Sequence, residues 1–407
     1  MTDVADSGGE AAEAPPFPMP RTCPFDVPEG YAGLRDTPGL PSVPLPTGKR
    51  GWLVSRYDDA RQVLLDPGVS SDRTRQDHPV APIPKEMLKE FNQSLAGMDP
   101  PEHTVQRRMA NQTFTVKRMQ ELRPHIQQLV DQHIDAMLAG PRPVDLMQAL
   151  AKPVPSLMIC ELIGVPEQDL STVEEITRGT LARNPEDRPP AFLRLNAYLD
   201  ELVRAKHEEP GDDLLGRLVV SNRERAEADQ LDLDDMVAMA RLLLQAGHET
   251  TTNLIGLGTV ALLEHPDQLA ELKADPSLTP NAVEELLRYL NITDVMLSRA
   301  AIADVKVGDT VIPDGDGIFV LTGASNRDER VFDNPDTFDI HRGARNHLAF
   351  GYGTHQCLGQ NLARMALDIV FRTLFARIPD LRLAVGVDEL PLKDVQPYGF
   401  HEIPVTW

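Results

Sequence analysis

A cysteine near the C-terminal end of the chain has the surroundings of a metal ligand. Cys357 lies in the run FGYGTHQCLG, residues 350–359, and apolar residues recur at helical spacing over 360–375. Gly351 and Gly353 allow a tight turn and a close approach of the backbone to a flat ligand. At a helix N-terminus, unpaired N–H groups and the helix dipole favour a thiolate, the form of cysteine that binds iron.

A second chemically suggestive pattern lies inside the longest helical segment, which the periodicity predicts over residues 233–264. There the run AGHETTT, residues 246–252, is poor helix-forming sequence, and such a conflict often marks a functional site. Gly247 leaves space for a ligand against the helix, and Thr250 could bond an upstream carbonyl or donate to a ligand. The alternative is a threonine cluster that bonds only its own backbone, with Glu249 in solvent.

Several basic residues could bind carboxylates. Asp99 is expected to cap a helix in which His103 and Arg107, four residues apart, share one face. Two such donors could hold a carboxylate, and arginine can do so with two parallel hydrogen bonds. Arg299 and His347, in extended segments, are further candidates. Taken singly, each of these residues could equally be an exposed basic side chain.

The elements that must position these residues are mostly helices. Periodic apolar residues predict helices at about 100–118, 119–139, 145–164, 168–181, 189–208, 211–221, 233–264, 266–274 and 279–290. Asp232 and Asp235 form a carboxylate version of a capping box at the start of the long helix. Strand-like runs are predicted from Trp52 and at 301–305, 310–312 and 318–321. The expected fold class is mainly α with a minor β portion.

Composition restricts the partners and the compartment. Lys and Arg number 40 and Asp and Glu 62 in 407 residues, and the resulting charge of −22 argues against nucleic acid or an anionic membrane. Three dispersed cysteines, Cys23, Cys160 and Cys357, give neither a disulfide framework nor a four-cysteine zinc site, so a cytoplasmic location is expected. Residues 1–22 read as a flexible tail without a targeting signal, and 23–407 as one domain.

The pattern Phe-x-x-Gly-x-x-x-Cys-x-Gly, filled by Phe350, Gly353, Cys357 and Gly359, resembles the haem-ligand loop of the cytochrome P-450 family. The resemblance extends over about residues 20–407. It implies the cytochrome P-450 fold, a helical prism around one haem b (iron protoporphyrin IX), with Cys357 as the iron ligand. A buried free cysteine, or a zinc site shared with His355, is the alternative that the residues alone leave open.

The same resemblance assigns roles to other residues. Thr250 and Glu249 would deliver protons to dioxygen. Residues implied to contact haem are His103, Arg107, Arg299 and His347 at the propionates, with Phe350, Gly351, Gly359 and Ala363 near the ring. A structural network that would fix the cysteine loop comprises Glu285, Arg288 and Arg342. The implied substrate pocket draws on Leu243, Ala246, Gly247, Ile292, Val295, Met296 and Phe400, and on the regions 79–98 and 165–192.

The activity implied by the resemblance is monooxygenation of a hydrophobic small molecule, by hydroxylation of a C–H bond or by epoxidation. The substrate would be a polyketide, macrolide, terpenoid or steroid-like compound. Because no flavin or nicotinamide motif is present, electrons from NAD(P)H would arrive through a ferredoxin reductase and a ferredoxin. The ferredoxin is expected to dock on a basic face formed by Arg108, Lys117, Arg118, Arg345, His355 and Arg364. A monomer is expected.

Two other activities remain compatible with the residues. One is a same-fold enzyme with different chemistry, such as a peroxygenase or an oxygen-independent isomerase. The other is a non-catalytic haem-binding protein. The pair Glu249 and Thr250 argues against the first, and the lack of an obvious output domain argues against the second.

Overall fold

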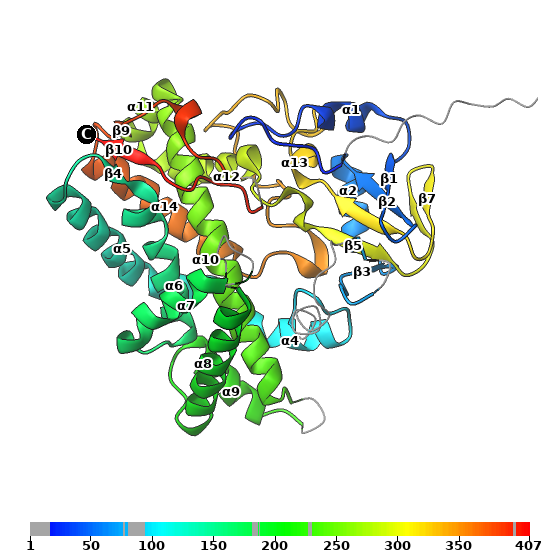
Figure 1. Ribbon diagram of the computed structural model, residues 1–407, viewed down its shortest axis with the longest axis horizontal. Coiled ribbons are helices and arrows are strands. Elements are labelled where there is room, and N and C mark those ends of the chain that lie inside the picture. Colours follow the sequence, from blue (N-terminus) through cyan, green and yellow to red (C-terminus); the bar gives the residue numbers. More distant parts are fainter. Residues whose placement is uncertain are drawn as a thin grey trace, which may run out of the picture.

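One long helix, α10 (Leu233–Leu263), crosses the molecule between a helical side and a sheet side (Figure 1). It begins with the predicted capping box: the Asp235 N–H donates to the Asp232 carboxylate at 2.8 Å, and the Asp232 N–H donates to the Asp235 carboxylate at 3.3 Å. The computed structural model describes residues 17–75, 78–79, 94–180, 186, 188–226, 230–393 and 396–407.

The helical side packs around α10 and α14. It contains α5 (Val116–Ala139), α6 (Pro153–Ile163) after a π-helical turn at Met147–Ala151, α7 (Leu170–Thr180), α8 (Arg188–Glu208), α9 (Leu214–Arg223), α11 (Pro266–Ala274), α12 (Thr279–Leu290) and α14 (Gln360–Arg377). α10 packs against α6 and α8, and α14 packs against α5. A side chain at Gly258 would place its Cβ 2.6 Å from the Phe371 ring, so this glycine lets α10 and α14 approach closely.

A five-stranded sheet forms the other side (Figure 1). Its order is β1 (Ser42–Pro44), β2 (Arg50–Val54), β8 (Gly317–Val320), β5 (Ser298–Ala301) and β3 (Val69–Ser70). β2 and β8 are parallel, with Trp52 opposite Ile318, and the other neighbours are antiparallel. Near it lie α1 (Gly30–Asp36), α2 (Tyr57–Leu65), α4 (Glu102–Asn111) and α13 (Thr322–Ser325).

Two smaller sheets complete the fold. One joins β4 (Val144–Asp145), β10 (Pro404–Thr406) and β9 (Arg382–Leu383), and the other joins β6 (Val305–Val307) to β7 (Thr310–Ile312). The predicted class, mainly α with a minor β portion, is confirmed. Among the described residues, no helix has the length and apolar character that crossing a bilayer would need.

Some predicted boundaries are wrong. The helix expected at 100–118 ends at Asn111, and the next begins at Val116, where the Thr115 hydroxyl accepts from the Arg118 N–H at 3.3 Å. Asp99 does not cap α4, because its carboxylate accepts hydrogen bonds from the Ser70 hydroxyl and, at 2.8 Å, from the Ser71 N–H. The strand expected at 301–305 is two strands: β5 ends at 301 and β6 starts at 305.

The N-terminal segment is held more firmly than predicted. Within the expected flexible tail 1–22, Arg21 donates to the carbonyls of Leu290 at 2.8 Å and Pro24 at 2.9 Å. The first of these carbonyls is left without an intrahelical partner at the end of α12, which explains why a cation is accepted there. Arg21 is thus bonded to the body of the protein, whereas residues 1–16 lie outside the described residues.

Candidate active site

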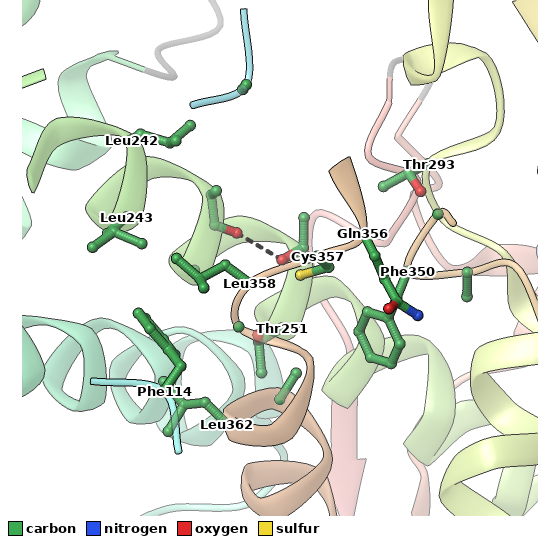
Figure 2. Close-up of a pocket in the computed structure, with 18 of the residues that line it drawn as sticks. Phe114, Leu242, Leu243, Thr251, Thr293, Phe350, Gln356, Cys357, Leu358 and Leu362 are labelled. Atoms are coloured by element: carbon green, nitrogen blue, oxygen red, sulfur yellow. Dashed lines mark hydrogen bonds between the residues drawn. The ribbon is translucent and has the colours of Figure 1, made fainter. Parts of the chain in front are cut away.

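A cavity of about 340 Å³ lies between α10, the segment after α12 and the loop that precedes α14 (Figure 2). Its walls are mostly aliphatic, and no carboxylate lines it among the residues that the structure describes. Predicted site residues that line it are Arg107, Leu243, Ala246, Gly247, Thr250, Ile292, Met296, Phe350, Gly351, Cys357, Gly359 and Ala363. Residues far apart in the sequence therefore meet around one apolar space.

The loop before α14 presents the sulfur of Cys357 to this cavity (Figure 2). Gly351 and Gly353 have φ values of +68° and +74°, and a Cβ at Gly353 would lie 2.6 Å from the Leu64 carbonyl oxygen. The Cys357 N–H donates to the Phe350 carbonyl at 2.8 Å, which closes the turn.

The electrostatic surroundings of the sulfur are mixed. Burial within the protein raises the pKa of the Cys357 thiol, while the Gly359 N–H and the guanidinium groups of Arg107 and Arg364 act in the opposite direction. The predicted helix-terminal position is only approximate, since the N-cap of α14 is Gly359 and the cysteine precedes it by two residues.

A wall of cationic and imidazole groups lies at one side of the cavity: Arg107 and His355 line the cavity, whereas His103 and Arg299 do not. The rings of His103 and His355 pack against each other, tilted by 40° with centroids 4.1 Å apart, and Arg299 and Arg107 lie close enough to lower the pKa of His355. Burial is the larger cause, and together these effects lower that pKa to about 3. Burial likewise lowers the pKa of Arg299 to about 10. His103 is 2% exposed, and neither ring nitrogen has a hydrogen-bond partner in the described part of the chain.

Two histidine assignments are therefore corrected. His347 does not join this wall, because its Nε2 lies 3.1 Å from a carboxylate oxygen of Glu284 in the interior. His355, predicted as a cation for partner docking, instead packs against His103 with a depressed pKa. Its position two residues before Cys357 was the sequence signal that it faces the cavity.

The threonine-rich part of α10 combines a local bond and a distant one. The Thr250 hydroxyl donates to the Ala246 carbonyl at 2.8 Å and lines the cavity. The Glu249 carboxylate does not line it, because the Lys393 ammonium donates to it at 2.9 Å. Gly247 borders the cavity and also permits close packing, since a Cβ there would lie 3.0 Å from Ile159.

The predicted network of Glu285, Arg288 and Arg342 is assembled. Arg288 donates two hydrogen bonds to the Glu285 carboxylate, at 2.7 and 2.8 Å, and both side chains are fully buried. Arg342 Nε donates to the same carboxylate at 3.2 Å. The remaining Arg288 N–H groups reach the carbonyls of Asn326 at 2.9 Å and Pro335 at 2.7 Å, so the network connects α12 to the chain that leads into the cysteine loop.

Several pocket predictions are wrong. Val295 packs toward the N-terminal apolar cluster, and Phe400 is 1% exposed within the main core, so neither lines the cavity. From the region 79–98, Leu95 and Ala96 line it, while 80–93 lie outside the described residues. The described part of 165–192 contributes no lining residue, and α6 supplies Met158 and Ile159 instead.

The expected basic docking face is smaller than predicted. Arg108, Lys117 and Arg345 are exposed. Arg118 donates to the Asp212 carbonyl at 2.7 Å and to Glu121 at 3.0 Å. Arg364 donates to the buried Glu284, so its charge is already balanced within the protein.

Comparisons with known proteins agree with this arrangement. The family model described as Cytochrome P450 matches residues 190–378. The chain is 44% identical to a vitamin D3 dihydroxylase of Streptomyces griseolus over 411 residues, covering all of both chains. It is 43% identical to the mycinamicin VIII C21 methyl hydroxylase of Micromonospora griseorubida, covering 96% of this chain and 99% of that one.

Solved structures give the same result. The crystal structure of cytochrome P450 MoxA from Nonomuraea recticatena superposes with a TM-score of 0.90 at 48% identity, covering 96% of this chain and 98% of that one. The mycinamicin VIII hydroxylase bound to mycinamicin VIII superposes with a TM-score of 0.88 at 43% identity, covering 96% and 99%.

Proposed function

The chain belongs to the cytochrome P450 family of monooxygenases, and from this premise we propose that it inserts one oxygen atom of O2 into a hydrophobic natural product. The inserted atom would form a hydroxyl group from a C–H bond or an epoxide from an alkene. The observation that carries the proposal is that Cys357 and Thr250, on separate elements, line one apolar cavity.

The residues present fit the haem that the family implies. The thiol of Cys357 is a ligand for iron, and the cavity walls are suited to the faces of a flat apolar ring. Both ring nitrogens of His103 are buried without a hydrogen-bond partner in the described structure, and the buried Arg299 and the half-buried Arg107 add positive charge near this ring. Two propionates would satisfy them. When bound, haem would supply the dioxygen chemistry through its thiolate-ligated iron.

On the opposite side of the cavity, α10 would handle protons. Thr250 is the alcohol of the predicted acid–alcohol pair. Its side chain lines the cavity, and its hydroxyl donates to the Ala246 carbonyl. Glu249, the preceding residue of the helix, is 22% exposed and paired with Lys393. Rotation of its carboxylate away from Lys393 would let it pass a proton from solvent to Thr250.

The lining of the cavity favours a large, mostly apolar substrate. Aliphatic side chains predominate on the α10 wall, and the described polar groups there are threonine hydroxyls. The relatives named as a vitamin D3 dihydroxylase, a pentalenic acid synthase and a mycinamicin VIII hydroxylase support a steroid-like, terpenoid or macrolide substrate. We propose this substrate class for the chain.

A separate ferredoxin, reduced by NAD(P)H through its reductase, is the proposed electron donor. Arg108, Lys117 and Arg345 supply exposed positive charge that an acidic partner could contact, although the whole chain carries −22. The monomeric state and the cytoplasmic location stay predictions.

The central test is the spectrum of the reduced protein with carbon monoxide. A strongly red-shifted Soret band is expected, and it should be absent in Cys357→His, which offers a neutral ligand. A wild-type spectrum without that band would overturn thiolate ligation. A ligand screen for the low- to high-spin shift, followed by product analysis with a ferredoxin and its reductase, then identifies the substrate. Ligands that bind without any oxidised product would favour a non-catalytic haem protein.

A further inference from the structure

Two adjacent glutamates of α12 form two separate buried ion clusters. Glu285 belongs to the network with Arg288 and Arg342, whereas Glu284 faces a different set of partners. Its carboxylate lies 2.7 and 3.1 Å from two guanidinium nitrogens of Arg364, the geometry of a bidentate pair. It also accepts a hydrogen bond from His347 Nε2 at 3.1 Å.

This Glu284 cluster, comprising Glu284, His347 and Arg364, joins three elements. Glu284 lies on α12, Arg364 lies in the first turns of α14, and His347 lies in the chain that enters the cysteine loop. Glu284 is 4% exposed and His347 is 6% exposed, whereas the Arg364 side chain is 25% exposed, so the cluster has a buried carboxylate and a partly buried cation. A buried charge is retained only when it is paired and hydrogen-bonded, and here every partner belongs to the surroundings of Cys357.

The protonation states in the cluster follow from its hydrogen bonds. Burial alone would raise the pKa of Glu284, but hydrogen bonds from His347 and Arg364 lower it to about 2, so the carboxylate is charged at neutral pH. The Ala349 N–H donates to His347 Nδ1 at 3.2 Å, which assigns the ring hydrogen to Nε2, facing Glu284. The cluster therefore contains one negative and one positive charge.

The positive charge lies against a residue of the cysteine loop. The Arg364 guanidinium sits 4.6 Å from the centroid of the Phe350 ring, and this ring lines the cavity with Cys357. The Phe350 carbonyl in turn accepts the Cys357 N–H at 2.8 Å. The Arg364 guanidinium is therefore one residue away from the cysteine, and Glu284 is the only carboxylate bonded to this guanidinium among the described residues.

We propose that Glu284 is a positioning residue for the cysteine loop whose negative charge balances Arg364 and thereby sets the reduction potential of the iron. The inference rests on the proposed function, since it concerns the haem-loaded protein. His347 supplies the loop contact, and Arg364 supplies the charge that must be balanced. In a low-dielectric interior, removing either charge leaves the other uncompensated near the iron.

The test is a charge cycle measured by mediated potentiometric titration of the haem-loaded protein, without a ferredoxin. Glu284→Gln leaves Arg364 unbalanced and should favour the ferrous form about tenfold, a shift of about 59 mV to higher potential for one electron. Arg364→Gln leaves Glu284 unbalanced and should shift the potential by a similar amount in the opposite direction. The double variant should return close to the wild type. Single variants that both shift the same way, or not at all, would overturn the proposal.

A matched control is available on the surface. Glu271 accepts from His341 Nε2 at 2.8 Å, but both side chains are more than half exposed, so Glu271→Gln should leave the potential unchanged. The His347→Phe substitution removes the contact between Glu284 and the cysteine loop but leaves the charges of Glu284 and Arg364 in place. It should keep the wild-type potential while the carbon monoxide complex loses its red-shifted band faster under mild denaturant. A His347→Phe potential that moves with that of Glu284→Gln would contradict the division of roles.

The two hypotheses fail in different ways. If wild-type protein gives no red-shifted band with carbon monoxide, thiolate ligation fails, whatever the charge cycle shows. If the band is present and Arg364→Gln and the double variant both keep the wild-type potential, only the role of Glu284 fails. Because this comparison uses Arg364→Gln and the double variant, it tests the role of Glu284 even if the Glu284→Gln variant does not load haem.

Discussion

His103 of α4 packs against His355 of the cysteine loop at a centroid distance of 4.1 Å, with the two rings tilted by 40°, while neither ring nitrogen of His103 is bonded within the described structure. This ring contact fixes the plane of the His103 imidazole and leaves its nitrogen-bearing edge available. Buried imidazole nitrogens without partners are rare, so this edge is where an anionic group of a ligand would bind. The first prediction follows from this geometry.

Replacing His103 by Phe should weaken haem retention without disturbing the ring contact. The variant keeps an aromatic ring against His355 but cannot donate a hydrogen bond to a propionate. Because hydrogen bonds to charged groups contribute about 1.5–3 kcal/mol, haem should leave about tenfold faster or more. The rate of haem transfer to excess apomyoglobin measures this. His133→Phe is the control, since that ring bonds the Leu129 carbonyl of its own helix at 2.8 Å; equal transfer rates for both variants would refute the assignment.

Replacing Thr250 by Ala should uncouple electron use from product formation. The hydroxyl lines the cavity, and its removal takes away the proposed proton donor while leaving the backbone of α10 intact. We expect product per NAD(P)H consumed to fall about tenfold or more, with hydrogen peroxide as the balance. Thr250→Ser keeps a hydroxyl and should retain most of the coupling. Peroxide-driven turnover of Thr250→Ala at the wild-type rate, with no loss of coupling, would favour the peroxygenase alternative.

Replacing Glu285 by Ala should lower both haem content and stability. The change leaves the fully buried Arg288 without its carboxylate, a type of loss that costs about 3–5 kcal/mol. Urea unfolding and the haem-to-protein ratio measure the two effects. Glu174→Ala removes a helical pair with Arg178, which is 68% exposed, and should cost less than about 0.5 kcal/mol. A fully loaded Glu285→Ala protein of normal stability would exclude the structural role.

Neutralising Arg108, Lys117 and Arg345 together should slow reduction by ferredoxin without altering substrate affinity. These side chains are exposed, so their contribution is long-range attraction that salt screens. Stopped-flow reduction should show a lower rate and a weaker dependence on ionic strength, with an unchanged spin-shift titration. Arg204→Gln on α8, where the guanidinium pairs with Asp200 at 2.7 Å, serves as the control. Wild-type reduction rates in the triple variant would place the docking face elsewhere.

Features that depend on neighbouring residues could be predicted from the sequence. The capping box of Asp232 and Asp235 requires only the first turn of α10, and it forms as expected. The Glu285 and Arg288 pair is likewise three residues apart on one helix. Long periodic segments predict the fold class, and the specific loop pattern around Cys357 predicts its position at the cavity.

Features that depend on distant partners could not be predicted in this way. Asp99 has the sequence of a helix cap, but Ser70 and Ser71 compete successfully for its carboxylate. The family resemblance assigns His347 to the propionates, but Glu284, buried on the distant α12, bonds its ring instead. Arg21 lies in an acidic, proline-rich segment that looks disordered, yet the end of α12 supplies carbonyls for it.

The parallel pairing of β2 with β8 has a consequence for how the protein is made. Trp52 leaves the ribosome long before Ile318, its partner in the register, so the sheet cannot close during most of translation. Such non-local pairing is slow because the loop between the strands must be ordered first. Arg299 in β5, which pairs with β8, belongs to the cation wall, and Cys357 follows later still. Haem capture is therefore expected as a late, post-translational event, and nascent chains should remain cofactor-free until the helical body is already built.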